Sequence, residues 1–141
     1  MKNLFILILA LAVQSCSLNS FDQEVEYRVD PLLKSYVDKF YEEAEKREVE
    51  LQKVNLIVLL SNEIGSKFGL SEIKNGQKIV SINSYLVDSN EKRLKVIIFH
   101  ELGHALLNRR HKDTQSSIMN SAPCTSCDFE TMLDELYSFT K

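Results

Sequence analysis

The sequence predicts an α+β domain that combines a short mixed sheet with an N-terminal helix, a central helix and a C-terminal helix. Three observations lead to this fold class. Asp30-Pro31 precedes a helical stripe of apolar residues, Asn75-Gly76 separates two strand-like runs, and residues 96–107 are apolar on nearly every side. An asparagine-glycine pair between such runs is a strong hairpin signal, and a helix that is apolar all round is buried. We therefore expect residues 96–107 to form the central helix.

The first residues of the chain are typical of an export signal. Met1-Lys2-Asn3 precedes an almost entirely apolar run at residues 4–13, which is too short to span a bilayer as a mature helix. Val13-Gln14-Ser15-Cys16 resembles a lipobox, which implies that residues 1–15 are a lipoprotein signal peptide and that Cys16 carries lipid. An ordinary signal peptide with an incidental cysteine is the alternative. The lipobox implies a bacterial envelope protein, held by its lipid anchor in the membrane and facing the periplasm or the cell exterior.

The rest of the chain has the length of one domain with a single core. Residues 16–29 are polar and irregular, so they are predicted to be a tether, and residues 30–141 are predicted to form the domain. The formal charge is −3 and no run of lysine and arginine stands out, so we expect no nucleic-acid partner.

The N-terminal helix is predicted to begin at Asp30, a suitable N-cap, with Pro31 at the first helical position, and to end near Lys53. Its buried stripe is predicted to be Leu33, Val37, Phe40 and Ala44. A charged run opposite that stripe is expected to face solvent rather than to bind a ligand: Glu42, Glu43, Glu45, Lys46, Arg47 and Glu48.

Strands are predicted at residues 54–60, 68–73 and 78–83, which gives a sheet of at least three strands. Asp88 and Glu91 have the spacing of a capping box at the start of the central helix. Residues 112–116 are predicted to be a polar loop. A C-terminal helix is predicted to begin at Asp128 and to bury Phe129, Met132, Leu133, Leu136 and Phe139.

All three histidines of the protein lie at the central helix or just after it, at His100, His104 and His111. Imidazoles at i and i+4 lie one turn apart on the same face, so both can bind one ion. Glu101 can take a proton from water on that ion, as in an H-E-x-x-H metallohydrolase. His111 supplies a third ligand, and a fourth position stays open for water, as catalytic Zn²⁺ requires. The alternative is chance spacing, with His111 an ordinary surface residue.

The run from His100 to His111, followed by Ser117-Ile118-Met119, resembles the metzincin zinc peptidases. That family has the pattern H-E-x-x-H-x-x-G-x-x-H followed by a Met-turn. The resemblance implies a small zincin domain with His100, His104 and His111 as zinc ligands, Glu101 as general base and Met119 as the Met-turn residue. In this chain the third histidine is one residue later than in the family, and Asn108 is a substitute for the family's glycine, because asparagine adopts the left-handed conformation that ends a helix.

The same resemblance implies a zinc-dependent peptidase that hydrolyses a peptide or protein substrate. The substrate is expected to lie extended along an edge strand at residues 78–86, with residues 120–123 forming the wall of the pocket beyond the cleaved bond. Two alternatives remain. Glu130 or Glu135 could replace His111 as the third ligand, or the protein could be a non-catalytic zinc-binding envelope lipoprotein on a metzincin scaffold.

Cys124 and Cys127 form a C-x-x-C pair after the Met-turn. In an exported protein this spacing favours a disulfide that braces the loop. A second metal site would need further nitrogen or sulfur ligands, yet every histidine is already assigned and Cys16 is at the membrane.

The lipobox generates a prediction about the location of the mature protein. Cys16→Ala removes the acylated residue, so we expect the protein to move from the membrane fraction to the soluble fraction of its host. Cell fractionation and mass spectrometry of the N-terminal peptide measure this. A wild-type protein that is soluble and carries no lipid contradicts the prediction.

Overall fold

The computed structural model describes residues 26–138. The predicted signal peptide (1–15), Cys16, the tether up to residue 25 and Phe139 lie outside the described residues. In chain order, the elements are β1 (Tyr27–Val29), α1 (Lys34–Lys46), β2 (Leu56–Ser61), β3 (Gly69–Lys74), β4 (Gln77–Asn83), the 3₁₀ turn η1 (Ser84–Leu86), α2 (Glu91–Leu107) and α3 (Phe129–Tyr137). The predicted α+β class with a mixed sheet and three helices is confirmed. No helix within residues 26–138 has the length and apolarity needed to cross a membrane.

The sheet has four strands in the order β1-β2-β4-β3. β1, β2 and β4 are parallel, whereas β3 and β4 form the antiparallel hairpin predicted at Asn75-Gly76. Two expectations are wrong. Residues 78–86 do not form the edge, because β4 pairs on both sides and β3 is the edge strand next to it. Tyr27–Val29, assigned to the tether, pairs with β2, so the sheet begins before residue 30.

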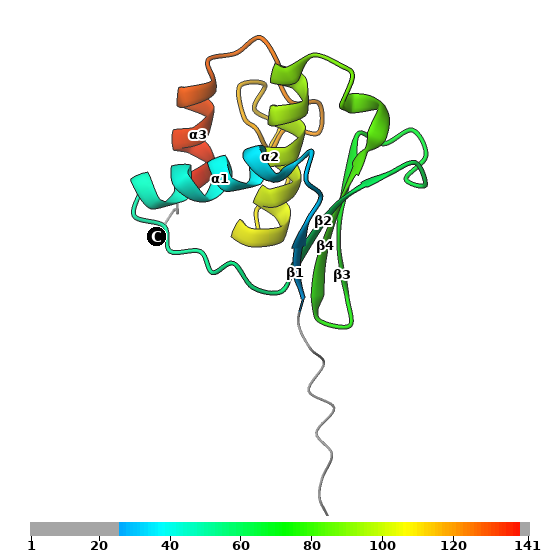
Figure 1. Ribbon diagram of the computed structural model, residues 1–141. Helices are drawn as coiled ribbons and strands as arrows, with labels where there is room; N and C mark the ends of the chain where they lie inside the picture. Colours follow the sequence, from blue (N-terminus) through cyan, green and yellow to red (C-terminus); the bar gives the residue numbers. More distant parts are fainter. Residues whose placement is uncertain (1–25, 139–141) are drawn as a thin grey trace, which may run out of the picture.

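The three helices lie on one face of the sheet (Figure 1). α2 packs against β3 and β4 and also contacts α1. Since α2 has neighbours on several sides, eleven of its residues are buried, which confirms the central helix. The predicted stripe of α1 is also confirmed, with Leu33, Val37 and Phe40 fully buried and Ala44 1% exposed.

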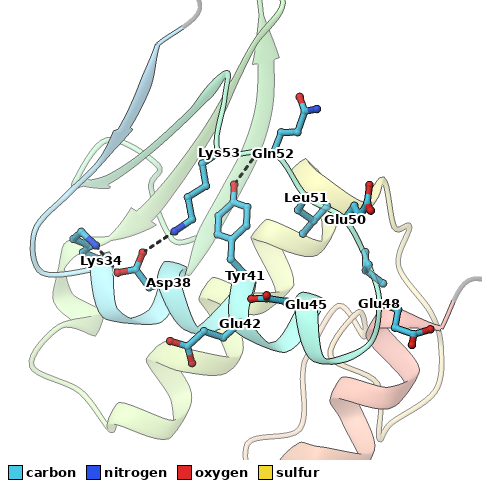
Figure 2. Close-up of a pocket in the computed structure, with 11 residues that line it drawn as sticks. Lys34, Asp38, Tyr41, Glu42, Glu45, Glu48, Glu50, Leu51, Gln52 and Lys53 are labelled. Carbon is cyan, nitrogen blue, oxygen red and sulfur yellow. Dashed lines mark hydrogen bonds and ion pairs between the residues drawn. The ribbon is translucent and has the colours of Figure 1, made fainter.

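Both ends of α1 differ from the prediction. Asp30 accepts a hydrogen bond from the Leu32 amide in a turn, and the helix begins only at Lys34. The helix ends at Lys46, because Glu48 adopts a left-handed conformation (φ 59°) and the Val49 amide donates to the Ala44 carbonyl at 2.9 Å. The chain then returns alongside the helix, where the Tyr41 hydroxyl donates to the Gln52 carbonyl at 3.4 Å (Figure 2).

The other two helices have side-chain caps. Asn90, rather than Asp88, caps α2, and its side chain accepts from the Lys92 and Arg93 amides at 2.9 and 3.3 Å. Asp128 caps α3 as predicted, with the Thr131 amide donating at 3.0 Å. α3 also buries Tyr137, whose hydroxyl donates to the Phe40 carbonyl at 2.7 Å and so joins α3 to α1.

Glu43 does not face solvent as expected, because it is only 2% exposed. Its carboxylate pairs with Lys39, Lys46 and Arg47 at 3.0, 2.7 and 2.6 Å. Burial alone would raise the pKa of Glu43, but the hydrogen bonds from these three cations outweigh burial and lower it to about 2. Arg47 also pairs with Asp134 of α3 at 2.8 Å, so the buried carboxylate is part of the contact between α1 and α3.

Glu43→Gln is predicted to lower the free energy of unfolding at pH 7 by about 1–3 kcal/mol, because three cations lose a buried partner. The folded pKa of Glu43 lies below its ordinary value of 4.5. The stabilisation is therefore complete above that value and is lost as the pH falls toward 2. Denaturant unfolding of both proteins from pH 7 to pH 3 should show the difference becoming smaller.

Glu42→Gln is the matched control, since Glu42 is on the same helix but has a 60% exposed side chain. It should change stability by less than about 0.5 kcal/mol. If the difference in unfolding free energy between Glu43→Gln and wild type stays constant from pH 7 to pH 3, the ionised Glu43 carboxylate is not the source of the stabilisation.

Candidate metal centre

His100 and His104 project from the same face of α2, and each ring is held by a carbonyl group outside the helix. The Nδ1 atom of His100 lies 2.6 Å from the Ile118 oxygen, and that of His104 lies 2.7 Å from the Arg109 oxygen. A carbonyl oxygen can only accept, so both Nδ1 atoms carry the proton and both Nε2 atoms have a free lone pair. This is the usual arrangement of histidines that bind a metal through Nε2.

His111 joins the two helical histidines because α2 ends sharply. Asn108 has the left-handed conformation predicted for it (φ 51°, ψ 34°), and the Arg109 amide donates to the Gly103 carbonyl at 3.0 Å. The chain then turns back toward the helix, and the Nε2 atom of His111 lies 3.2 Å from the Nε2 atom of His100. His111 is exposed, whereas His100 is buried and His104 is half-buried.

The short distances between the imidazoles fit a metal ion better than hydrogen bonds. The His100 and His104 Nε2 atoms are 3.1 Å apart, yet neither carries a proton to donate. Nitrogen ligands at tetrahedral Zn²⁺ are about 3.3 Å apart, given Zn–N bonds of about 2.0–2.1 Å. The Nε2 separations of 3.1 and 3.2 Å lie close to that value. The three histidines could therefore hold a metal ion, and a cation would relieve the repulsion between their lone pairs.

The electrostatics of the site keep the helical imidazoles neutral. Burial lowers the pKa of His100 to about 4, although the bond to the Ile118 carbonyl opposes the change, and charge on His104 or His111 lowers it further. Burial also lowers the pKa of His104, with a smaller contribution from His111. A neutral imidazole is the form that binds a metal, so protons compete weakly for these two ligands near neutral pH.

Glu101 lies next to His100 on α2 and against the edge strand β3. A Cβ atom at Gly69 would lie 2.6 Å from Cγ of Glu101, so only glycine leaves room for this carboxylate. Glu101 is 7% exposed, and burial raises its pKa to about 7, with the positive charge of Lys67 opposing the rise. Its carboxylate has no hydrogen-bond partner among residues 26–138, so it is free to accept a proton.

Met119 packs against the same helix in the turn predicted for it. A Cβ atom at Gly103 would lie 2.7 Å from the Met119 sulfur, so the absence of a side chain at Gly103 allows the close contact. Met119 is fully buried, and its amide donates to the Ser117 hydroxyl at 3.0 Å. This turn also includes Ile118, whose carbonyl fixes the His100 ring.

Two adjoining hollows open on either side of the histidines. The first, about 450 Å³, extends along β3 and past His104 to Asn108. The second, about 250 Å³, lies between Phe68 and the segment after the Met-turn. Five residues line both hollows, so the candidate base and two of the three histidines face one cleft: Lys67, Gly69, His100, Glu101 and His111.

The segment after the Met-turn contributes to the wall of this cleft. Ser121 and Pro123 line the smaller hollow, as expected for part of residues 120–123. Cys124 and Cys127, which follow directly, are joined by a disulfide. The disulfide closes a small loop next to Pro123 and limits the conformations of the wall.

The glutamates considered as alternative ligands are engaged elsewhere. Glu130 is on the exposed side of α3, where it lies 3.5 Å from Arg47. Glu135 pairs with Arg109, Lys112 and Ser117. Neither belongs to the group of side chains whose ligand atoms lie within 4.8 Å of one another, which consists of the three histidines.

A larger hollow of about 900 Å³ lies away from the histidines, between α1 and residues 48–53 (Figure 2). Carboxylates predominate in its lining, and Asp38 among them pairs with Lys34 and Lys53. Among residues 26–138, no histidine or cysteine lines this hollow. The groups that line it therefore do not suit a transition metal. Although this hollow is larger than the two beside the histidines, we do not take it as the functional site.

Sequence reasoning did not single out Gly69 or Lys67, although a signal for Gly69 existed. An isolated glycine in a strand often marks a close approach of another group to the backbone. No such signal pointed to Lys67, because its place in the cleft depends on how the loop before β3 packs.

Comparison of the chain with protein-family models, with curated proteins and with solved structures finds no match. The fold and the site therefore define its class: an α+β domain with a histidine triad that could hold a metal ion.

The geometry predicts that His111 is a ligand. His111→Ala should weaken zinc binding by more than the roughly 10–100-fold typical of losing an outer residue of a metal site. Because His111 is exposed, stability without metal should change little, whereas the stabilisation by added zinc should fall. Competition with a chromophoric chelator and thermal unfolding with and without zinc measure both effects.

Glu130→Ala is the control and should bind zinc as wild type does. Equal zinc affinity of His111→Ala and wild type would exclude His111 as a ligand.

Proposed function

We propose that the protein is a zinc-dependent peptidase with a reduced metzincin-like domain. The observation that carries the proposal is the convergence of three imidazole Nε2 atoms beside a buried carboxylate that has no hydrogen-bond partner within residues 26–138, in a cleft along the edge strand β3. Three imidazoles with a position left for water are a donor set typical of catalytic zinc, whereas structural zinc sites are closed by four protein ligands. A structural site would also have no use for Glu101.

In this proposal Glu101 is the general base. It accepts a proton from the water that attacks the scissile carbonyl carbon, and it passes that proton to the amide nitrogen as the carbon–nitrogen bond breaks. Zinc, when bound by His100, His104 and His111, polarises the carbonyl and lowers the pKa of water. Because Gly69 has no side chain, the Glu101 carboxylate can lie close to the strand. Lys67 adds positive charge near this carboxylate.

The proposed substrate is an extended peptide that adds to the edge of β3. The Asn83 amide donates to the Phe68 carbonyl at 2.9 Å, so the alternating pattern of an antiparallel pair turns the main-chain groups of Gly69, Ser71 and Ile73 away from β4. These groups can pair with a peptide by strand addition. The hollow lined by Ser121 and Pro123 would take a side chain beyond the cleaved bond.

We place this activity in the bacterial envelope, with Cys16 as the lipid-anchored residue. The lipobox-like sequence supports the anchor. The Cys124–Cys127 disulfide supports an oxidising compartment, because disulfides persist outside the cytoplasm. Because both cysteines belong to the domain, the disulfide supports an extracytoplasmic location independently of the lipobox-like sequence at residues 13–16.

Glu101→Gln tests the function. The amide keeps the size of the side chain but cannot accept the proton, so peptide cleavage should fall by roughly 10²–10⁴-fold, while zinc affinity stays the same. Cleavage of a mixed peptide library by the zinc-loaded protein, followed by mass spectrometry, measures turnover.

Lys95→Gln is the control, because Lys95 is on the same helix, over the ring of Phe129 and away from the cleft lining. If the wild-type protein binds zinc but cleaves no peptide, and Glu101→Gln changes nothing measurable, the protein is a non-catalytic zinc-binding lipoprotein.

A further inference from the structure

Glu135 of α3 is the common partner of the segment that surrounds the third histidine. Its carboxylate accepts hydrogen bonds from Arg109 Nη2 at 3.2 Å, from the Ser117 hydroxyl at 2.7 Å and from the Lys112 ammonium. The side chain of Glu135 is 27% exposed, so these bonds are partly shielded from solvent. The three donors lie before and after His111 in the chain, and each is connected to a group that holds a histidine.

Arg109 connects Glu135 to the His104 ring. The Arg109 carbonyl accepts the His104 Nδ1 proton, and the guanidinium of the same residue is fixed at the end of α3. There it donates to the carbonyl oxygens of Glu135 and Ser138, both at 2.9 Å, as well as to the Glu135 carboxylate. The main chain of Arg109 is therefore held from α3, and the orientation of His104 depends on that main chain.

Ser117 connects Glu135 to the His100 ring. Its hydroxyl donates to Glu135 and accepts from the Met119 amide at 3.0 Å. Ile118 lies between these two bonded residues, and its carbonyl accepts the His100 Nδ1 proton at 2.6 Å. A shift of the Ser117 hydroxyl would move the carbonyl that orients His100.

Lys112 connects Glu135 to His111 itself. The Lys112 amide donates to the Met119 carbonyl at 2.9 Å, and its ammonium binds the Glu135 carboxylate. Arg109 and Lys112 lie on either side of His111 in the sequence. Both ends of this short segment therefore bind the Glu135 carboxylate. The segment has no regular secondary structure, and these bonds replace the hydrogen bonds that a helix or strand would provide.

We propose that Glu135 is a positioning residue of the metal centre. It is not a ligand; it acts through Arg109, Ser117 and Lys112 to hold the carbonyls that orient His100 and His104 and the segment that presents His111. The inference rests on the metal-binding part of the proposed function and not on peptide cleavage. Outer residues of this kind typically contribute 10–100-fold to metal affinity.

The test compares Glu135→Gln with Glu130→Gln, a change of the same chemistry on the same helix at a side chain that is 74% exposed. Zinc affinity is measured by competition with a chromophoric chelator, and the visible absorption of the Co²⁺-loaded protein reports ligand geometry. We expect Glu135→Gln to bind zinc about 10–100-fold more weakly and to change the Co²⁺ spectrum. Glu130→Gln should match wild type in both measurements.

A merely structural role would give a different result. In that case thermal unfolding of metal-free Glu135→Gln would occur at lower temperature, while zinc affinity and the Co²⁺ spectrum of the folded protein matched wild type, and the proposal would be overturned. If Glu135→Gln does not fold, Ser117→Ala removes one of the three bonds to the Glu135 carboxylate, together with the bond that the Met119 amide donates to the same hydroxyl. It should still weaken zinc binding and change the Co²⁺ spectrum, and a wild-type result for Ser117→Ala overturns the proposal.

The two proposals fail in distinguishable ways. If wild type binds neither zinc nor Co²⁺, the metal centre and the proposed function both fail. If wild type binds zinc tightly and Glu135→Gln binds it equally well with an unchanged Co²⁺ spectrum, only the role of Glu135 fails.

Discussion

The candidate metal centre depends on two hydrogen bonds from imidazole Nδ1 atoms to main-chain carbonyls, at 2.6 and 2.7 Å. These bonds fix the tautomer of His100 and His104, so both Nε2 lone pairs face the same point. Both acceptors belong to residues that come after α2, at Arg109 and Ile118. A helix alone therefore cannot build this site, because the rings of its two histidines are oriented by the segment that follows the helix. The left-handed Asn108 is where that dependence begins, since it turns the chain back across the histidines.

The sheet makes its own contribution to the site through the edge strand β3. Gly69 lets the strand approach α2 so closely that the Glu101 carboxylate occupies the space of a missing Cβ. Within residues 26–138, alternate main-chain groups of the same strand have no strand partner, and the strand lines the cleft. β3 therefore provides both the space for the buried carboxylate, at Gly69, and the edge that faces the cleft. Gly103 has a parallel role on the other side of the helix, where it admits the Met119 sulfur.

Local sequence signals predicted much of the fold and of the centre. The i, i+4 histidines, the left-handed Asn108, the hairpin at Asn75-Gly76 and the Asp128 cap each depend on a few neighbouring residues. Features that depend on distant partners were not predictable in this way. Glu43 was expected in solvent because its neighbours are charged, but it is 2% exposed, and Arg47, one of its three cationic partners on α1, also pairs with Asp134 of α3. The edge strand was assigned to residues 78–86 by analogy with the metzincin family, and hydrophobic alternation could not correct this, because it does not show which strand of a hairpin also pairs with β2.

The role of Glu135 was likewise not predictable from local sequence. Its hydrogen bonds also explain how a segment without regular secondary structure can hold His111. From sequence Glu135 was considered as a metal ligand, since a downstream glutamate completes the H-E-x-x-H motif in some peptidases; in space it binds Arg109, Ser117 and Lys112. α3 has only nine residues, and isolated helices shorter than about 12 residues are marginal in water. Its position must come from packing, through the Tyr137–Phe40 bond and the Arg47–Asp134 pair on the side toward α1. Asp134 and Glu135 are adjacent, so their side chains point about 100° apart around the helix axis. Asp134 can therefore bind α1 while Glu135 binds the segment that carries His111. The geometry of the histidines is therefore coupled through α3 to the packing of α1, in which Glu43 is buried.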